Sequence, residues 1–387
     1  MRILNIVTSV DPNQGGVIEN VVQLGKFLSR EHRYEIASLD APDAPWVADA
    51  PLKVHAFGPA VTGYAYAPRL TQWIRAHRKD YDIVLVHGIW QFGSYATWKA
   101  LRNTSTPYLV FPHGMLDPWF KRTYPLKHLK KLMYWPWAEY RVLRDARAVC
   151  FTCEEERVLA RQSFGLYRAR ETVVSFGTAA PPDDANAQRA AFEAAFPDLR
   201  DKKLLLFLSR IHVKKGADLL IEAFARVAQR DPNLHLVMAG PDQQGLQAEL
   251  QALAQKLGVA QRITWTGMLQ GELKWGAFRA ASAFVLPSHQ ENFGIVVAEA
   301  LACGVPVLIS DKVNIWREIA ADNVGWVAPD TLEGTLANLE AWLGAPNEEI
   351  EAMQSAAVRC FNERFEIGGA ARSLLAVIER ELAKRQR

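Results

Sequence analysis

Short apolar runs alternate along this chain with longer stretches in which apolar residues recur every three or four positions. A short apolar run bounded by turn residues indicates a buried strand, and the longer period indicates an amphipathic helix. The runs at 2–9, 82–87 and 107–111 are each followed by a stretch of helical character. This alternation predicts doubly wound parallel sheets and therefore an α/β fold.

The predicted strands fall into two groups. The first group lies at 2–9, 34–39, 52–57, 82–87, 107–111, 148–152 and 172–176, and the second at 204–209, 234–239, 263–266, 283–287 and 305–310. A chain of 387 residues is too long for one ordinary core, so we expect two domains. We place the N-terminal domain at 1–177, a Pro-rich linker at 178–202, the C-terminal domain at 203–368 and a last amphipathic helix at 369–387.

Residues 283–310 form one predicted strand–turn–helix–strand unit that carries two carboxylates. Glu291 lies in the polar turn before a helix at 293–303, and Glu299 lies about two turns along it, so the two are roughly 10 Å apart. Ligands of parallel sheets bind at the carboxyl ends of the strands, where this turn falls, and a helix N-terminus suits a phosphate. The carboxylates therefore face two ends of a nucleotide-sized ligand, or they are solvated charges at a helix end.

A second strand-to-helix loop, at 210–216, is basic. Arg210 follows the strand at 204–209, and Lys215 precedes the next helix. A planar guanidinium fork and a compact ammonium together suit a diphosphate. A basic loop is also common as ordinary solvated surface, so this feature alone leaves both interpretations open.

Two further features mark strand ends in the N-terminal domain. Gly15 and Gly16 lie at the first strand-to-helix crossing, where glycine permits close backbone approach to an anion or serves turn geometry alone. His87 and His113 each lie at the carboxyl end of a strand, where ligands of such sheets bind. A histidine in this position is a ligand contact or a hydrogen-bonded packing residue.

Two strings in the C-terminal half resemble the signatures of one enzyme family. Glu291-Asn-Phe-Gly294, followed by Glu299 and Ala-Leu-Ala-Cys-Gly-Val-Pro-Val, resembles the signature of retaining glycosyltransferases of the GT-B fold, of the family 4 (group 1) type. Ser-Arg210, four residues, then Lys215-Gly resembles the second signature of that family. The resemblance implies two Rossmann-like domains facing a cleft, an acceptor held by the N-terminal domain, and a last helix that crosses back to that domain.

The resemblance also implies roles for individual residues. Glu291 would lie beside the donor sugar and Glu299 would hold the ribose hydroxyls. His113-Gly114 resembles a His-Gly pair whose imidazole faces the sugar, which favours His113 over His87. The expected catalytic residues are His113, Glu291, Arg210 and Lys215. The expected donor-binding residues are Gly15, Gly16, Arg210, Lys215, Glu291, Asn292, Phe293, Gly294 and Glu299, with Gly240, Met268 and Leu269 near the base.

The function that the resemblance implies is a retaining hexosyl transfer from a nucleotide-diphosphate sugar to a glycan or lipid-linked acceptor, in bacterial surface polysaccharide biosynthesis. Cationic side chains at the diphosphate can replace a divalent metal, so we expect neither a metal nor another cofactor. A GT-B nucleotide-sugar epimerase is an alternative, but it needs acid–base carboxylates for anti elimination. A non-catalytic nucleotide-sugar-binding protein is a second alternative, and the presence of both carboxylates and His113 disfavours it.

Residues 121–144 are rich in Lys, Arg, Trp and Tyr. Apolar residues near one face of a predicted helix, which Pro136 would kink, are Leu126, Leu129, Met133, Trp137 and Tyr140. A basic amphipathic helix of this kind lies in a membrane interface, or its apolar stripe packs on its own domain. The first interpretation predicts a peripheral protein on an anionic membrane. Its interfacial rings would be Tyr134, Trp135, Trp137 and Tyr140.

Composition narrows the class of protein. Hydrophobic residues make up 49% of the chain and charged residues 22%, as in soluble globular proteins, and the net charge of +3 gives no general attraction to nucleic acid.

Cys150 and Cys153 form a single C-x-x-C without a second pair at zinc spacing, so we interpret them as small residues in and after a strand. The chain begins directly as a strand, and no uncharged apolar run reaches the ~18–20 residues of a membrane span, so we expect a cytoplasmic location.

Overall fold

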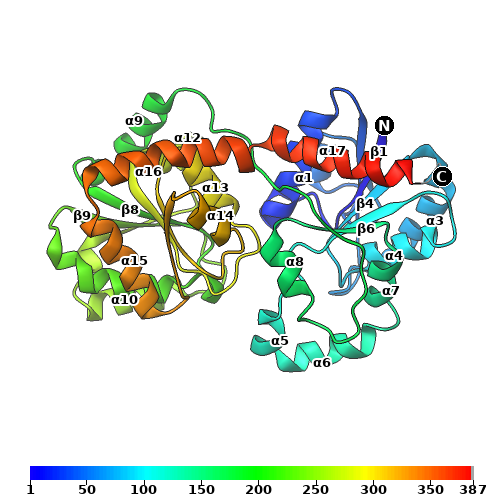
Figure 1. The fold of residues 1–387 in the computed structure, drawn as a ribbon, viewed down its shortest axis with the longest axis horizontal. Coiled ribbons are helices and arrows are strands. Elements are labelled where there is room, and N and C mark those ends of the chain that lie inside the picture. Colours follow the sequence, from blue (N-terminus) through cyan, green and yellow to red (C-terminus); the bar gives the residue numbers. More distant parts are fainter. Residues whose placement is uncertain (385–387) are drawn as a thin grey trace. The chain divides into compact units, whose positions relative to one another are not determined.

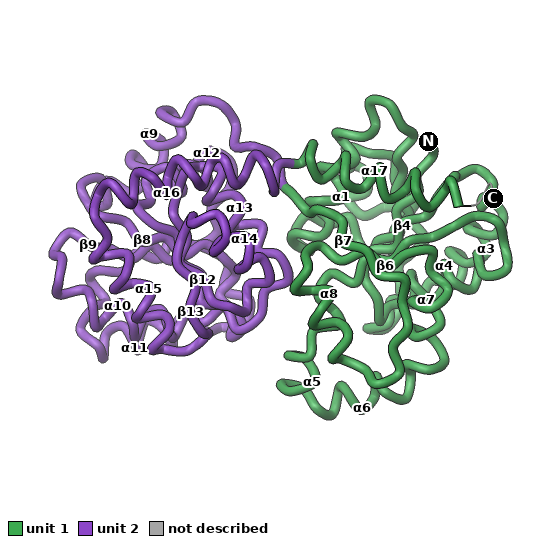
Figure 2. The backbone as a smooth tube through the Cα atoms, in the orientation of Figure 1, with its two compact units in different colours: residues 1–177, 367–387 green, residues 178–366 purple. Residues whose placement is uncertain are grey.

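The computed structural model describes residues 1–384, which divide into two compact units (Figures 1 and 2). Unit 1 comprises residues 1–177 together with the C-terminal segment that begins at Ile367, and unit 2 comprises Thr178–Glu366. Each unit contains one sheet of parallel strands with helices packed around it (Figure 1). The two parallel sheets confirm the predicted α/β class.

The sheet of unit 1 has seven strands in the order β3-β2-β1-β4-β5-β6-β7. The strands are β1 Arg2–Ile6, β2 Arg33–Ser38, β3 Val54–Ala56, β4 Ile83–His87, β5 Tyr108–Phe111, β6 Ala148–Phe151 and β7 Glu171–Val173. The direction in which strands are added reverses between β1 and β4, which are hydrogen-bonded neighbours. In sheets of this kind, ligands bind beyond the carboxyl ends of the two strands at such a reversal.

Helices cover both faces of this sheet. They are α1 Gly16–Leu28, α2 Pro45–Ala48, α3 Pro68–His77, α4 Phe92–Leu101, α5 Trp119–Thr123, α6 Pro125–Tyr134, α7 Glu139–Asp145, α8 Glu154–Ala160 and α17 Ile367–Ala383. Alternate residues of a strand point to opposite faces, so the apolar run of β1 supplies two cores. Ile3 packs in a core with α1 and α17, and Leu4 packs in a core with α3 and α4.

The C-terminal helix α17 completes the first of these cores. Ala370, Leu374 and Ile378 are buried in the same cluster as Ile3 and Leu24. Helix α17 contacts α1, and Figure 1 shows the two lying side by side. The helix therefore belongs to unit 1, although the whole of unit 2 precedes it in the sequence. The last three residues of the helix predicted at 369–387 lie outside the described part of the chain.

The sheet of unit 2 has six strands in the order β10-β9-β8-β11-β12-β13. The strands are β8 Lys203–Leu208, β9 Leu234–Ala239, β10 Ile263–Gly267, β11 Ala281–Leu286, β12 Val307–Ser310 and β13 Gly325–Ala328. The helices are α9 Ala185–Ala195, α10 Ala217–Val227, α11 Gln247–Lys256, α12 Gly271–Ala280, α13 Ile295–Ala302, α14 Trp316–Ala321, α15 Leu332–Gly344 and α16 Asn347–Cys360. The reversal of strand order lies between β8 and β11.

The segment predicted as a linker at 178–202 is part of unit 2 instead. Asp184 caps α9 by accepting a hydrogen bond from the Ala187 N–H at 3.0 Å, and the helix packs on α12 with Phe192 buried. The Pro-rich residues do form a turn ahead of α9, but the Ala-rich stretch behind them is a packed helix. The polar residues of this stretch hide its short amphipathic pattern in the sequence, and this explains why a linker was predicted where the structure has a helix.

The basic segment 121–144 forms separate short helices, α5, α6 and α7, rather than one helix kinked at Pro136. Pro125 is the first residue of α6, a position where proline is favoured. Trp135 lies in the core between α6 and α7, where its ring stacks on Phe164 at 4.0 Å. The hydroxyl of Tyr134 is hydrogen-bonded to that of Tyr64. Of these two residues, which we expected at a membrane interface, Trp135 is buried in unit 1, and Tyr134 is half-buried and held by Tyr64.

Three properties of the described residues bear on the class of protein. None of their helices combines the length and the apolar character that crossing a membrane requires. Residues 1–384 contain no cluster of three or more His, Cys, Asp or Glu side chains arranged to hold a metal ion. Cys150 lies in β6 and Cys153 is the N-cap residue of α8, and both are buried.

Candidate functional site

Two loops of unit 2 meet where its strand order reverses. The loop at 210–216 follows β8, and the loop at 287–294 follows β11. Gly216 has a φ of +63°, and a Cβ on it would lie 2.3 Å from the carbonyl oxygen of Pro287. Only glycine fits there, so this residue lets the two loops pack backbone to backbone.

This packing brings Lys215 and Glu291 together. The Lys215 ammonium forms an ion pair with the Glu291 carboxylate, and the two side chains are 10% and 21% exposed. The backbone of Glu291 is fixed as well, because its N–H donates to the Lys312 carbonyl at 2.9 Å and its carbonyl accepts from the Asn314 N–H at 3.0 Å. The pair offers a cation for an anionic ligand beside an acceptor for hydroxyl groups.

Arg210 begins the same loop as Lys215 but lies on its other side. Its guanidinium is exposed, and Nη1 donates to the side chain of Gln243, in the loop after β9, at 3.3 Å. The structure thus places both predicted cations at the carboxyl edge of the sheet, with Lys215 toward β11 and Arg210 toward β9.

Glu299 is paired with a lysine that the sequence pattern did not single out. It lies buried on α13, which begins at Ile295 rather than at Phe293, and its carboxylate accepts from Lys274 Nζ at 2.6 Å. Lys274 comes from α12, and its ammonium also lies 5.0 Å from the centre of the Trp275 ring. Nothing in the local pattern of α12 distinguishes Lys274 from a surface lysine, so only the fold identifies it.

The remaining residues predicted around the donor have mixed environments. Met268 is exposed after β10, while Leu269 is buried. Phe293 is buried with its ring edge-on to Phe365 at 5.5 Å, so it packs the loop that precedes α13. A Cβ on Gly240 would lie 1.8 Å from the Ser209 carbonyl oxygen, so this glycine is required for the β8 and β9 loops to pack together.

In unit 1, His87 and His113 form a hydrogen-bonded pair at the carboxyl ends of β4 and β5. His87 Nε2 faces Asn5 Oδ1 at 3.1 Å, and His87 Nδ1 faces His113 Nε2 at 3.0 Å. The Asn5 amide nitrogen donates to the Glu35 carbonyl at 3.2 Å, so the Asn5 oxygen is the atom that accepts from His87. His87 therefore carries its proton on Nε2, and His113 donates from Nε2 to His87 Nδ1.

This arrangement leaves Nδ1 of His113 as a hydrogen-bond acceptor. It is buried and has no hydrogen-bond partner within residues 1–384. Burial lowers the pKa of His113 to about 3 and holds that of His87 well below its usual value, so both rings are neutral at pH 7. The ring of His113 lines a small hollow with Asn20 and Phe176. A ligand hydroxyl that reaches this hollow can donate to Nδ1.

Glu156 holds the turn that presents His113. His113 has a φ of +51°, and the following Gly114 N–H donates to Glu156 Oε1 at 2.6 Å. Oε2 of Glu156 accepts from the N–H and the hydroxyl of Thr152, each at 2.7 Å. The predicted glycines lie at the same edge of the sheet, because Gly15 directly precedes α1 in the connection from β1.

One other pair of carboxylates, Asp80 and Asp82, forms an Asp-x-Asp string ahead of β4. The string therefore lies at the amino end of that strand, opposite the edge that carries His87. Arg2 holds Asp82 through its N–H and its guanidinium, both at 2.8 Å. These carboxylates are thus remote from the ligand-binding edge of unit 1.

Two family models match the two units. One described as "Glycosyl transferase 4-like domain" matches residues 15–177, and one described as "Glycosyl transferases group 1" matches residues 189–357. The first range contains the glycine pair and His113, and the second contains the two Lys–Glu pairs. A D-inositol 3-phosphate glycosyltransferase of Geodermatophilus obscurus is 37% identical over 200 residues, which are 49% of this chain and 43% of that protein. The match thus spans less than half the length of that relative.

Solved structures share the fold at low sequence identity. HepE of Anabaena, in complex with UDP and glucose, has a TM-score of 0.76 at 18% identity, with 98% of this chain and 99% of that chain covered. WaaG, a glycosyltransferase involved in lipopolysaccharide biosynthesis, has a TM-score of 0.70 at 16% identity, with 97% and 99% covered. These likenesses show that the chain has the GT-B fold, and the two family models, which together match most of its length, show that it belongs to the group 1 glycosyltransferases.

Proposed function

We propose that this glycosyltransferase moves a hexosyl group, with retention of configuration, from a nucleotide-diphosphate sugar to a glycan or lipid-linked acceptor. The observation that carries the proposal is the arrangement in unit 2, where Lys215 holds Glu291 and Lys274 holds Glu299 along one loop and helix. HepE, which has the same fold, binds UDP and glucose, and this supports the class of donor. WaaG acts in lipopolysaccharide biosynthesis, which supports a role in bacterial surface polysaccharide.

The charges in unit 2 suit the departure of a diphosphate. As the bond from the sugar C1 to the diphosphate oxygen loosens, negative charge grows on the leaving group. Arg210, Lys215 and the free N–H groups at the start of α13 stabilise that charge. When Lys215 engages the diphosphate, the Glu291 carboxylate is released to accept hydrogen bonds from the sugar. The acceptor hydroxyl attacks from the same face, and the departing phosphate oxygen takes its proton.

The proposal also gives one further residue of each unit a role toward the donor. Glu299 accepts hydrogen bonds from the ribose hydroxyls, and His113 accepts one from a sugar hydroxyl through Nδ1. The proposal includes no metal, because Arg210 and Lys215 supply the positive charge that the leaving group requires.

The test is incubation with a panel of nucleotide sugars and with glycan and lipid-linked acceptors, with products identified by mass and the new C1 configuration by NMR. We expect Arg210→Ala and Lys215→Ala each to lower turnover by roughly 10²–10³, the usual effect of losing one electrostatic stabiliser. Lys256→Ala, on the exposed side of α11, is the control. Near-normal turnover in both loop variants would contradict the diphosphate role, and inversion at C1 would contradict retention.

Calorimetry separates the roles of the two carboxylates. We expect Glu299→Gln to weaken binding of the free nucleoside diphosphate, and Glu291→Gln to act mainly on the intact donor and on turnover. If Glu291→Gln has the larger effect on the free nucleotide, the two assignments are reversed.

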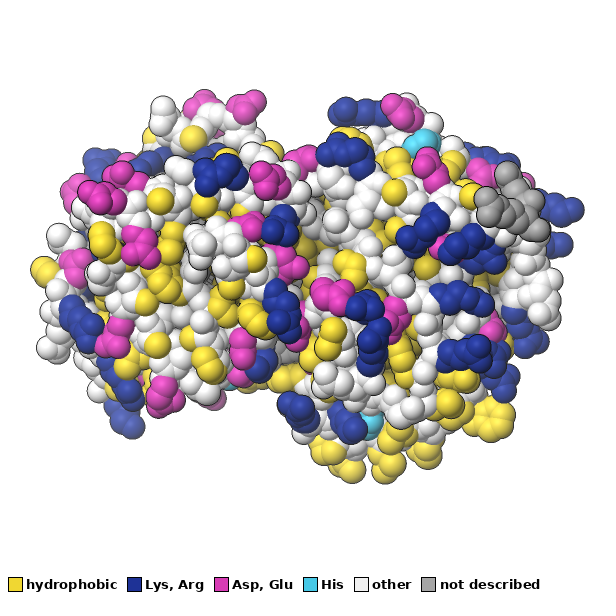
Figure 3. Space-filling model, in the orientation of Figure 1, with side chains coloured by type: hydrophobic (Ala, Val, Ile, Leu, Met, Phe, Trp, Pro, Cys, Tyr) yellow, Lys and Arg dark blue, Asp and Glu magenta, His cyan; other side chains and the backbone are white. Residues whose placement is uncertain are grey.

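We further propose that the enzyme is cytoplasmic and docks on the inner face of an anionic membrane through α6. This helix buries none of its residues, and Leu126, Met133 and the nearby Trp137 are 78%, 67% and 69% exposed. Figure 3 shows hydrophobic side chains along the lower edge of unit 1, with Lys and Arg side chains beside them. Four residues of the apolar stripe, Leu126, Leu129, Met133 and Trp137, are thus exposed, whereas Tyr140 packs against the core of unit 1. The exposed part, together with the basic residues, supports the membrane interpretation.

Vesicle co-sedimentation at low and high salt tests this docking. Each basic residue near an anionic surface contributes about 1 kcal/mol, so reversing two charges with Arg122→Glu and Lys130→Glu should weaken binding at least about tenfold. Trp137→Ser should weaken it at both salt concentrations, since the loss is apolar. Equal sedimentation with neutral and anionic vesicles, unchanged in these variants, would leave the segment as ordinary surface.

A further inference from the structure

The two Lys–Glu pairs of unit 2 differ in how far the carboxylate is buried. The side chain of Glu299 is 6% exposed, and that of Glu291 is 21% exposed. Their lysines follow the opposite order, at 25% for Lys274 and 10% for Lys215. The pair formed by Lys274 thus joins a deeply buried carboxylate to a cation that still reaches the surface.

Glu299 depends on a cation more than Glu291 does, because it has less contact with water. A carboxylate withdrawn from water is stable only when it is paired, and removing its partner is strongly destabilising. Lys274 Nζ lies 2.6 Å from Glu299 Oε1. A carboxylate has about four acceptor sites, and one ammonium occupies one of them. Glu299 can therefore accept hydrogen bonds from a ligand while the ion pair stays in place.

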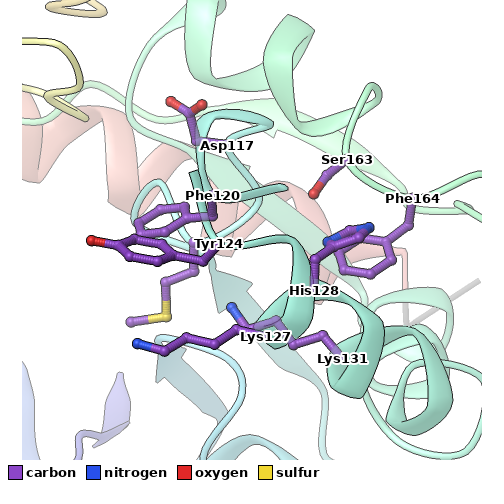
Figure 4. Close-up of a pocket in the computed structure, with 9 residues that line it drawn as sticks. Asp117, Phe120, Tyr124, Lys127, His128, Lys131, Ser163 and Phe164 are labelled. Carbon is purple, nitrogen blue, oxygen red and sulfur yellow. The ribbon is translucent and has the colours of Figure 1, made fainter. Parts of the chain in front are cut away.

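The aromatic contact of Lys274 does not account for this pair. Lys274 Nζ lies 5.0 Å from the centre of the Trp275 ring. Lys131 of α6 makes the same kind of contact, with Nζ 4.5 Å from the centre of the Trp90 ring, and Figure 4 shows its side chain at a hollow lined by aromatic rings. Within residues 1–384, however, Lys131 is not in ion-pair contact with a carboxylate. A lysine of this protein can thus pack on a tryptophan ring without an acidic partner.

The pair is also set back from the loop that is proposed to bind the diphosphate. Lys274 is the fourth residue of α12, and Glu299 is the fifth residue of α13. At about 1.5 Å rise per residue, Glu299 lies roughly 6 Å along α13 from its first residue. Lys215, in contrast, belongs to the loop at 210–216 itself. We therefore expect a bound diphosphate to draw Lys215 away from Glu291 and to leave the pair of Lys274 and Glu299 closed.

We propose that Lys274 is a positioning residue for recognition of the donor ribose. It offsets the charge of the Glu299 carboxylate and fixes its orientation on α13, while that carboxylate accepts from the two ribose hydroxyls. Hydrogen bonds to an ionised acceptor are roughly twice as strong as those between neutral groups. Lys274 thus acts on the ribose through Glu299 and does not touch the donor. The inference rests on the proposed function, which gives Glu299 its role toward the ribose.

Calorimetry with the full-length protein tests this role. The probes are UDP and GDP, and the one that binds more tightly is compared with its 2′-deoxy counterpart, dUDP or dGDP. Removing the 2′-hydroxyl should weaken binding to the unaltered protein at least about tenfold. We expect Lys274→Met to bind the ribonucleotide at least about tenfold more weakly than the unaltered protein, and to lose no more than about threefold further when the 2′-hydroxyl is removed. The two losses are not additive, because both act on the same carboxylate.

Two other variants separate positioning from general effects. Lys274→Arg keeps a cation beside Glu299, so it should bind the ribonucleotide within about fivefold of the unaltered protein. Lys131→Met removes a lysine that packs on a tryptophan ring without a carboxylate, and it should stay within about twofold for both nucleotides. Titrations are run at a temperature at which scanning calorimetry shows each variant to be folded. If Lys274→Met is unfolded throughout, Lys274→Gln, which keeps a donor without the charge, takes its place.

Three results would overturn the inference. An equal loss on removal of the 2′-hydroxyl in Lys274→Met and in the unaltered protein would leave Lys274 as a structural partner of Glu299 alone. Ribonucleotide binding by Lys274→Met within about twofold of the unaltered protein would show that the cation is not needed. Equal binding of the two nucleotides by the unaltered protein would remove this inference and leave the transfer reaction standing. Failure of UDP, GDP and every nucleotide sugar to bind would instead remove the proposed function itself.

Discussion

Replacing Glu156 with glutamine should destabilise unit 1 and loosen the turn that presents His113. The carboxylate is buried, and its oxygens accept from the Gly114 N–H at 2.6 Å and from the N–H and hydroxyl of Thr152 at 2.7 Å each. Glutamine has nearly the same volume but only one acceptor oxygen. Its amide NH₂ must therefore face one of these donors.

The size of the effect follows from these contacts. If the amide oxygen stays with Thr152, the Gly114 N–H loses a charge-assisted hydrogen bond, which is worth about 1.5–3 kcal/mol. A buried donor left without an acceptor costs about 1–3 kcal/mol. Since these contributions overlap, we expect the free energy of unfolding of unit 1 to fall by roughly 2–4 kcal/mol. In a unit of this size that corresponds to a Tm lowered by roughly 4–16 °C.

Differential scanning calorimetry measures this shift without a substrate. Glu154→Gln is the matched control, because Glu154 lies on the same helix and forms an exposed pair with Arg157. Exposed pairs contribute at most about 1 kcal/mol, so its Tm should change by no more than roughly 4 °C. A Tm shift in Glu156→Gln no larger than that of the control would refute the reasoning. It would mean that the buried carboxylate does not hold the turn.

Three further predictions concern His113, Lys274 and Glu139. Nitrogen NMR at pH 7 should find the proton of the His113 imidazole on Nε2, and a proton on Nδ1 would contradict the hydrogen-bond chain from Asn5. Lys274→Met should lower the unfolding free energy of unit 2 by roughly 1–3 kcal/mol, because it removes the cation paired with a buried carboxylate, and denaturation unchanged from the unaltered protein would contradict that pair. Burial raises the pKa of Glu139 to about 7, so the unfolded chain ionises this carboxyl at lower pH than the folded one. The free energy of unfolding should therefore fall by up to roughly 3 kcal/mol, relative to that of Glu139→Gln, as the pH rises from 4.5 to 7. A difference in Tm between the two proteins that stays constant from pH 5 to 8 would contradict this.

The features that could be predicted depend on residues that lie close together in the sequence. Most strands of the two sheets are short apolar runs, because a strand buried on both faces needs apolar residues at nearly every position. The edge strands differ: β7 is Glu-Thr-Val, and β13, which buries none of its residues, was not predicted. Arg210 and Lys215 stand in one loop, and Glu291 and Glu299 stand in one loop and helix. Residues this close in the sequence also lie close together in the fold, so their spacing could indicate a shared site.

The remaining site residues depend on packing between distant segments. Lys274 reaches Glu299 from a different helix, and Asn5 fixes the proton positions of His87 from another strand. Glu156 accepts a hydrogen bond from the N–H of Gly114, which lies more than forty residues earlier in the sequence. No periodicity or motif marks such partners. The same limit explains Trp135, whose place in the core is set by Phe164 rather than by its basic neighbours.

The position of α17 has a consequence for synthesis on the ribosome. Residues 1–177 of unit 1 precede unit 2 in the sequence, yet part of the core of unit 1 consists of Ala370, Leu374 and Ile378, which are translated after the whole of unit 2. Unit 2 is encoded as one continuous segment, so it can finish folding while unit 1 still lacks a helix. The first unit to emerge is thus the last to be completed. Premature termination before Ile367 would yield a nascent chain with an apolar face of its N-terminal sheet uncovered, which makes such a fragment a substrate for chaperones and proteases.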